Sequence, residues 1–282
     1  MPIRLLQHII KETAVTNNLK KIMPSEPLIG LIDCFYVMSC DITSNELLFN
    51  DGMPAMVCMS SPESMAMLSV NKKTIEIKGG WVSGGITKNT YIEHLFNTDY
   101  LFIIRFNPTS FYTLFEIDTR IFKQQCIGTI NEILKTKGNQ LALSVFGTTD
   151  ISDKINTVEA YIGSLEYRHS SAPLLSEAIN FIKAQKGRTS IKDVSHKIGA
   201  NYKWLERKFS SCIGLTPKEY ANLQRFAHTY LEMTEDIEKD FLSIAVQNGY
   251  YDQSHFFKDF RSYAGVSPLQ YIKALNPVGM NR

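Results

Sequence analysis

Apolar and polar residues alternate differently in the two halves of this 282-residue chain. Between residues 28 and 106, short apolar or alternating runs rich in Val, Ile, Phe and Tyr are separated by turn residues such as Asn50-Asp51-Gly52. Runs of this kind predict the strands of an antiparallel sheet or barrel. The runs cover residues 28–38, 46–50, 53–59, 65–70, 74–82 and 100–106.

Helical signals begin after this β-rich region. Asn107-Pro108 has the sequence of an N-cap followed by a proline at the first helical position. Further helices are expected over residues 127–135 and 151–165. The polar segment 167–173 ends in proline and predicts a domain boundary.

No strand-like alternation is present between residues 174 and 274, and the chain length fits two domains. The expected fold class is therefore α+β with two domains. Residues 1–166 are expected to form an antiparallel, β-rich, barrel-like domain that also contains helices. Residues 174–282 are expected to form an all-α domain of short helices joined by tight turns.

An internal repeat occupies the last 85 residues or so. Both copies follow the pattern F-x4-G-x2-[ST]-P-x2-Y, which starts at Phe209 in the first copy and at Phe260 in the second, 51 residues later. Upstream, Gly199 is matched by Gly249, 50 residues later. One residue has therefore been added within the second copy.

Each copy predicts two short helices joined by a glycine turn. A capping box then starts the next helix, at residues 216–219 in the first copy and at residues 267–270 in the second. Two such helices make a helix-turn-helix, and two units with the same spacing are a stronger signal than one. The alternative is a packed helical repeat with no nucleic-acid role.

The segments that carry this repeat are IKDVSHKIGANYKWLERKFSSCIGLTPKEYANLQRF and FLSIAVQNGYYDQSHFFKDFRSYAGVSPLQYIK. Over roughly residues 174–275 the chain resembles the DNA-binding domain of AraC/XylS family transcription regulators. The resemblance implies two units joined by a long helix at about residues 217–233. It also implies recognition helices at about 202–212 and 253–263, placed in successive major grooves about 34 Å apart. The first 170 residues resemble, more loosely, the β-rich domain that senses an effector or mediates dimerisation in this family.

In the first unit, Lys203, Glu206 and Arg207 share the outward face of the expected recognition helix. By resemblance they match the base-reading positions of the family. Arg207 can donate two hydrogen bonds to guanine, and Glu206 can accept one from cytosine. Lys203 suits either a base or a phosphate. A solvated face with a Glu206–Lys203 pair is the alternative.

In the second unit the outward residues are Gln253, Ser254, His255, Phe257 and Lys258. Gln253 suits adenine, and Ser254 can read either a donor or an acceptor. Lys258 stands where the family often has arginine, so it would bind as a point charge. His255 is either a contact or an ordinary surface residue. Phe257 packs either on a thymine methyl or against the domain itself.

Charge is distributed unevenly but mildly. The whole chain carries a net charge of +2. Residues 171–282 hold 15 basic and 11 acidic side chains, and the first 170 residues hold 15 and 17. This permits a nucleic-acid partner for the C-terminal part, with modest affinity from counterion release. Dimerisation through the N-terminal domain would compensate.

The N-terminal half has no recognisable catalytic or metal-binding motif, so no catalytic residue, metal or cofactor is expected. Candidate effector contacts are Phe35, Tyr36, Trp81 and Arg105. The aromatic residues form either a ligand cavity or an ordinary core. Arg105 lies inside a strand and needs a partner, which is either an anionic effector or a structural carboxylate.

Five cysteines without a CxxC motif fit a reducing cytoplasm, and those of the N-terminal half are expected to be buried, inert thiols. The longest apolar runs are too short to cross a bilayer. The expected function is that of a cytoplasmic, sequence-specific transcription regulator rather than an enzyme. Its expected partners are double-stranded DNA, a small-molecule effector, a second copy of the chain, and RNA polymerase if it activates, with no membrane.

Two alternatives remain open at this point. The N-terminal barrel could be an enzyme or an alkyl-acceptor protein that the helical domain only targets. The chain could also be a protein–protein adaptor.

Overall fold

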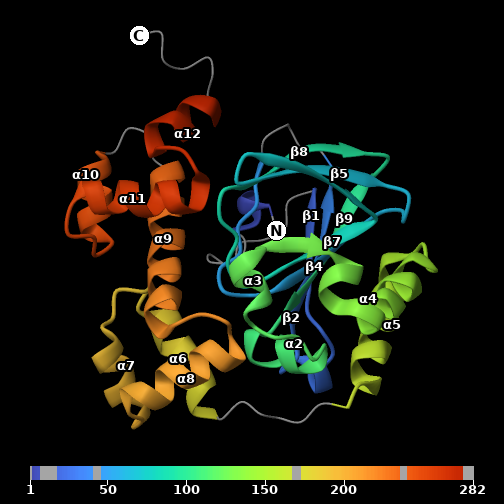
Figure 1. Ribbon diagram of the computed structural model, residues 1–282, viewed down its shortest axis with the longest axis horizontal. Coiled ribbons are helices and arrows are strands. Elements are labelled where there is room, and N and C mark those ends of the chain that lie inside the picture. Colours follow the sequence, from blue (N-terminus) through green and yellow to red (C-terminus); the bar gives the residue numbers. More distant parts are fainter. Residues whose placement is uncertain (1, 7–17, 41–45, 167–172, 236–239, 276–282) are drawn as a thin grey trace.

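The computed structural model describes residues 2–6, 18–40, 46–166, 173–235 and 240–275. A β-rich N-terminal domain lies beside a helical C-terminal domain, whose long helix α9 (Pro217–Glu235) connects two groups of shorter helices (Figure 1). The α+β class expected from the sequence is confirmed. The predicted boundary falls largely on residues 167–172, outside the described residues, so the exact division of domains stays a prediction.

The N-terminal domain contains two antiparallel sheets. The six-stranded sheet has the order β1-β2-β9-β4-β7-β10, and the four-stranded sheet has the order β3-β8-β5-β6. The strands are β1 (Leu19–Ile22), β2 (Ile32–Ser39), β3 (Glu46–Leu47), β4 (Ala55–Met59), β5 (Met65–Val70), β6 (Lys73–Lys78), β7 (Gly80–Ser83), β8 (Thr90–Phe96), β9 (Tyr100–Phe106) and β10 (Ile127–Thr129).

The run at residues 74–82, expected as one strand, divides into β6 and β7, which belong to different sheets. The division falls at Gly79, whose φ of 69° lies in the left-handed region that glycine tolerates. At Gly80 a Cβ atom would lie 2.1 Å from the main-chain oxygen of Val57. The Gly79-Gly80 pair therefore lets the chain pass from one sheet to the other.

For the helix predicted at residues 127–135, the predicted start is wrong. Residues 127–129 form β10, which pairs with β7, and the helix α4 (Ile130–Phe146) follows it. Thr129 and Glu132 make a capping box there, which fixes the helix start three residues later than expected. The other helical elements of this domain are η1 (Ile3–Leu5), η2 (Glu26–Leu28), α2 (Pro108–Leu114), α3 (Ile121–Gln124) and α5 (Ile151–Ser164).

Apolar side chains fill both faces of the six-stranded sheet. One cluster packs between the two sheets and includes Tyr36 and Trp81. A second cluster packs between this sheet and helices α2, α4 and α5, and includes Phe35, Phe102 and Phe106. Alternation along β2 thus sends neighbouring side chains to different cores.

Among its described residues, the C-terminal domain contains helices and the turns that connect them, as expected. Its helices are α6 (Pro173–Ala184), α7 (Ile191–Ile198), α8 (Tyr202–Cys212), α9, α10 (Phe241–Gln247), α11 (Gln253–Ala264) and α12 (Pro268–Leu275). Helices α6 to α8 lie at one end of α9, and α10 to α12 at the other (Figure 1). No helix in the described part of the chain is long and apolar enough to cross a membrane.

The second half of the helical domain shares its core with the N-terminal domain. Phe49, which follows β3, packs against Phe226 of α9 and Tyr263 of α11, with ring centroids 5.5 and 6.1 Å apart. Leu47 belongs to the same buried cluster. The two domains are therefore joined by an apolar interface as well as by the chain.

Candidate nucleic-acid interface

The first helix-turn-helix unit consists of α7 and α8. Helix α7 ends at Gly199, whose φ of 64° makes the predicted left-handed turn. The side chain of Asn201 then caps α8 by accepting a hydrogen bond from the main-chain nitrogen of Trp204 at 2.9 Å. Leu205 and Phe209 are fully buried, so they face inward as the repeat predicts.

The outward face of α8 carries the predicted DNA-contact residues. Lys203 and Arg207 are exposed, and Glu206 is half-buried. Glu206 accepts a hydrogen bond from the hydroxyl of Tyr202 at 2.7 Å, whereas the alternative of a solvated face paired it with Lys203. That hydrogen bond raises the pKa of Tyr202. The two cationic side chains of this face are therefore exposed to solvent.

The second unit repeats this construction with α10 and α11. Gly249 has a φ of 78°, and Asp252 caps α11 through the main-chain nitrogen of His255 at 2.7 Å. Phe256 and Phe260 are fully buried. The two capping boxes predicted after the units are present as well, at residues 216–219 and 267–270.

On α11, Ser254, His255 and Lys258 are exposed and Gln253 is half-buried. The ring of His255 packs edge-on against Tyr250, with centroids 5.3 Å apart. Phe257 turns towards α10, where its ring lies 6.0 Å from that of Phe241. Of the two open possibilities for Phe257, the structure favours packing within the domain.

Three further side chains belong to this surface and were missed in the sequence. Tyr202 is 50% exposed at the first residue of α8, and Tyr251 is 91% exposed just before α11. Arg261 is exposed in the third turn of α11. No local signal in the sequence marks the two tyrosines, because single exposed aromatic residues are normal on protein surfaces.

The C-terminal turns of α8 and α11 contact the N-terminal domain. The hydroxyl of Thr119 donates to the main-chain oxygen of Ser210 in α8 at 3.1 Å. The hydroxyl of Tyr91 donates to the main-chain oxygen of Ala264 at the end of α11. The main-chain nitrogen of Asn89 donates to the main-chain oxygen of Tyr263 at 2.5 Å. The N-terminal turns, which carry the predicted base contacts, are left accessible.

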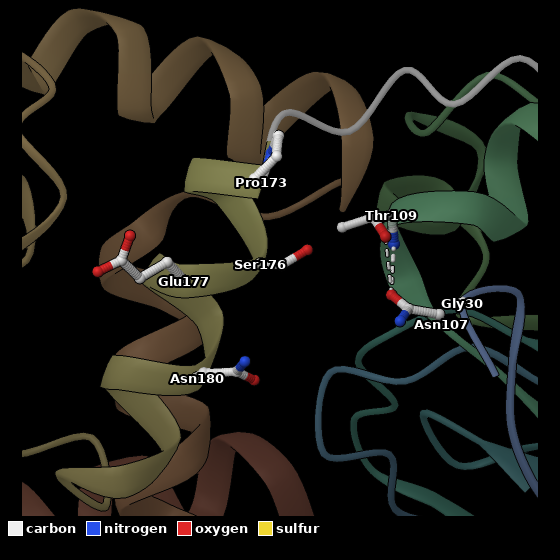
Figure 2. Close-up of a pocket in the computed structure, with 7 residues that line it drawn as sticks. All are labelled: Gly30, Asn107, Thr109, Pro173, Ser176, Glu177 and Asn180. Atoms are coloured by element: carbon white, nitrogen blue, oxygen red, sulfur yellow. Dashed lines mark hydrogen bonds between the residues drawn. The ribbon is translucent and has the colours of Figure 1, made fainter.

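A cleft of about 550 Å³ lies between α6 and the N-terminal domain (Figure 2). It is lined by Gly30, Asn107 and Thr109 on one side and by Pro173, Ser176, Glu177 and Asn180 on the other. Within it, Asn107 Oδ1 accepts hydrogen bonds from the main-chain nitrogen and the hydroxyl of Thr109. Part of its polar lining is therefore used to cap α2.

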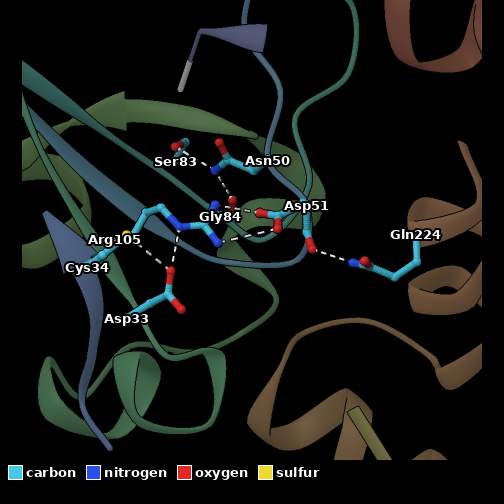
Figure 3. Close-up of polar contacts among 8 residues, drawn as sticks. All are labelled: Asp33, Cys34, Asn50, Asp51, Ser83, Gly84, Arg105 and Gln224. Carbon is cyan, nitrogen blue, oxygen red and sulfur yellow. Dashed lines mark hydrogen bonds and ion pairs between the residues drawn. The ribbon is translucent and has the colours of Figure 1, made fainter. Parts of the chain in front are cut away.

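Arg105 lies at the centre of a buried polar cluster next to α9 (Figure 3). Its guanidinium contacts Asp33 at 2.8 Å and Asp51 at 2.7 Å. Burial alone would raise the pKa of Asp33, but the charge and hydrogen bond of Arg105 lower it below its usual range. Of the two partners left open for Arg105, the structural carboxylate is the one found.

The residues predicted to contact an effector do not line one cavity. Phe35 lies on the helix-covered face of the sheet, whereas Tyr36 and Trp81 lie between the two sheets. All three are fully buried, and the charge of Arg105 is already compensated by two carboxylates. Period-two alternation alone could have separated Phe35 from Tyr36.

The cysteines differ in burial. Cys34 and Cys58 are buried, and burial raises the pKa of both thiols to about 12. Cys40, Cys126 and Cys212 are half-buried. No cluster of three or more His, Cys, Asp or Glu side chains suited to a metal ion occurs among residues 2–6, 18–40, 46–166, 173–235 and 240–275.

Both domains of the chain match known protein families. Residues 194–274 match the family described as a helix-turn-helix domain, and residues 20–128 match a domain of unknown function, DUF6597. The melibiose operon regulatory protein of Escherichia coli (strain K12) is 30% identical over 100 residues, which are 35% of this chain and 33% of that protein. The uncharacterized HTH-type transcriptional regulator YisR of Bacillus subtilis (strain 168) is 28% identical over 101 residues, or 36% and 35%.

Among solved structures, ToxT from Vibrio cholerae O395 has a TM-score of 0.44 and 14% sequence identity, with 93% of this chain and 98% of that chain covered. The match to the first curated relative spans only 33% of its length.

The fold and the surface define a protein with a tandem helix-turn-helix domain. Over its C-terminal domain, the chain is similar to helix-turn-helix transcription regulators, and these matches support the resemblance to the AraC/XylS family.

Proposed function

We propose that this protein is a sequence-specific DNA-binding transcription regulator that inserts α8 and α11 into successive major grooves. The observation that carries the proposal is the repeated unit itself. In both copies the apolar side of the second helix is buried and its N-terminal polar side is exposed. Helix-turn-helix proteins read base edges with that part of the recognition helix.

The proposed base contacts are Lys203, Glu206 and Arg207 from α8. From α11 they are Gln253, Ser254, His255 and Lys258. Tyr202, Tyr251 and Arg261 extend the same surface.

Selection of bound sequences from a pool of random duplexes tests the proposal. We expect a motif with two half-elements about 10 bp apart, one for each recognition helix. Enrichment of a single half-element, or of no sequence at all, would contradict the insertion of both helices.

We also propose that the N-terminal domain regulates DNA binding through its contacts with the recognition helices. Tyr91 and Thr119 hold the C-terminal turns of α11 and α8, so a change in the N-terminal domain reaches both units. We expect Tyr91→Phe to weaken binding to a duplex with both half-elements and to leave binding to the first half-element alone unchanged. Equal affinities of Tyr91→Phe and the unchanged protein for both duplexes would contradict this coupling.

Effector binding, a homodimer and a contact with RNA polymerase are further proposals for the N-terminal domain or the whole protein. The division into residues 1–166 and 174–282 belongs with them. Buried thiols with raised pKa values give no support to the alternative of a cysteine alkyl acceptor at Cys34 or Cys58.

A further inference from the structure

The two helix-turn-helix units differ in charge at positions that the internal repeat makes equivalent. The first unit has five cationic side chains, namely Lys192, Lys197, Lys203, Arg207 and Lys208. The residues 50 or 51 positions later are Leu242, Gln247, Ser254, Lys258 and Asp259. One of the five positive charges is kept, three positions become neutral and one becomes acidic.

The net charges of the two units follow the same trend. Residues 191–212 contain five basic and two acidic side chains, a net charge of +3. Residues 241–263 contain two of each, a net charge of zero. The C-terminal domain is therefore not uniformly basic, and its positive charge is concentrated in the first unit.

These differences lie on the surface. Lys192 and Lys197 are exposed on α7. On α10, Leu242 and Val246 are 46% and 52% exposed, at the positions of Lys192 and His196 in the first unit. The first helix of a helix-turn-helix crosses the DNA backbone. In the first unit this helix is α7, whose exposed face is cationic. In the second unit it is α10, whose exposed face carries apolar residues.

Asp259, the acidic residue at the position of Lys208 in the first unit, has a structural role in the second unit. Asp259 lies 3.7 Å from the guanidinium of Arg225 in α9, and that guanidinium stacks on the ring of Tyr250 at 4.3 Å. Arg225 also donates to the main-chain oxygen of Gly249 in the turn before α11. The position of Lys208 in the first unit is therefore used in the second to fix α11 against α9, rather than to attract phosphate.

We infer that the first unit supplies most of the phosphate neutralisation and that the second unit contributes chiefly base and shape recognition. This inference rests on the proposed function. Each neutralised phosphate adds about 0.9 to the slope of log affinity against log salt concentration. Most of the salt dependence of binding is then expected to come from the side chains of α7 and α8. The half-element that contacts them would contribute most of the electrostatic part of the affinity.

Fluorescence anisotropy with the full chain and its selected duplex, from 50 to 200 mM salt, measures this slope. For Lys192→Ala with Lys197→Ala, we expect the slope to fall by about two, so that the affinity lost over this salt range is roughly tenfold smaller. The matched pair Leu242→Ala with Gln247→Ala removes side chains at the equivalent positions and is expected to leave the slope unchanged. The graft Leu242→Lys with Gln247→Lys is expected to raise it by about two.

An unchanged slope in the lysine pair, or equal changes in the two matched pairs, would overturn the inference while leaving sequence-specific binding intact. If the unchanged protein binds no duplex selectively, the proposed function fails and the inference fails with it. Because all four positions are exposed or partly exposed, thermal unfolding midpoints close to that of the unchanged protein are expected, and they confirm that each variant is folded.

Discussion

The side-chain amide of Gln224 in α9 donates a 2.5 Å hydrogen bond to the main-chain oxygen of Asp51, whose carboxylate holds the buried Arg105. One residue thus connects the helix between the two DNA-binding units to the charged centre of the N-terminal domain (Figure 3). Gln224 is itself buried, so this contact has little competition from water.

Replacing Gln224 with alanine tests how much this contact holds the domains together. The main-chain oxygen of Asp51 would lose this partner in a buried site, which costs about 1–3 kcal/mol of unfolding free energy. Urea unfolding measures the change. Gln185→Ala, at an exposed position after α6, is the matched control and is expected to change the unfolding free energy by less than about 0.5 kcal/mol. Equal effects of the two substitutions would contradict a stabilising role for the contact.

The Arg105–Asp33 pair predicts a pH-dependent contribution to stability. Because the folded protein lowers the pKa of Asp33, the pair stabilises the fold above the unfolded pKa of about 4. That stability is lost as the pH falls through the lower, folded pKa. We expect Asp33→Asn to cost about 1–3 kcal/mol at pH 7 and less at pH 3, as measured by urea unfolding at both pH values.

The control for this pH dependence is Asp99→Asn, because Asp99 is exposed. Its effect is expected to be small at both pH values. A destabilisation by Asp33→Asn that stays the same from pH 7 to pH 3 would show that the charge of Asp33 does not act through Arg105.

Gly52 occupies a place where the two domains meet closely. Its φ is 97°, and a Cβ atom there would lie 2.2 Å from the ring of Tyr220. We expect Gly52→Ala to destabilise the protein by more than about 1 kcal/mol, because both the backbone and the domain contact must shift. Gly163→Ala, in helix α5 with no atom within 4 Å of the new Cβ, is expected to be neutral or to stabilise by up to about 1 kcal/mol.

Differential scanning fluorimetry of the two glycine variants gives the comparison directly. A melting temperature for Gly52→Ala equal to that of the unchanged protein would mean that the loop and Tyr220 separate without cost.

The second domain could be predicted from the sequence in much greater detail than the first. Its glycine turns and caps act locally, so Gly199 and Asn201 fix the start of α8 without reference to distant residues. The repeat then provides an internal check on each assignment. The exposed aromatic residues Tyr202 and Tyr251 were missed because hydrophobic periodicity does not mark them.

The N-terminal domain was predicted less well because its sheets depend on pairing between distant residues. The strands β1 and β8 were not expected, and β10 was taken as the start of a helix. The charge of Arg105 signalled a partner, but nothing local in the sequence links it to Asp51, 54 residues away. The contacts of Tyr91 with α11 depend on how two domains meet, which no local pattern encodes.

Arg207 and Lys258 occupy equivalent positions of the two recognition helices, so their substitutions make a matched pair. We expect Arg207→Ala to relax the preference at one base pair of the first half-element, at a cost of about 1–3 kcal/mol. Lys258→Ala is expected to act on the second half-element only, with a smaller loss of base preference. Arg120→Ala, an exposed arginine of the N-terminal domain, is the control.

Sequence selection repeated with each variant measures these changes. A motif that is identical for the unchanged protein and for Arg207→Ala would remove Arg207 from the proposed base contacts. If Arg120→Ala changed the motif as much, the effect would not be specific to the recognition helices.

Dimethyl sulfate methylation interference on the selected duplex tests the central claim most directly, because it reports which guanines the protein needs in the major groove. Two groups of interfering guanines on one face of the duplex, about one helical turn apart, are the predicted result. A single group, or interference confined to the minor groove, would contradict the insertion of α8 and α11 into successive major grooves.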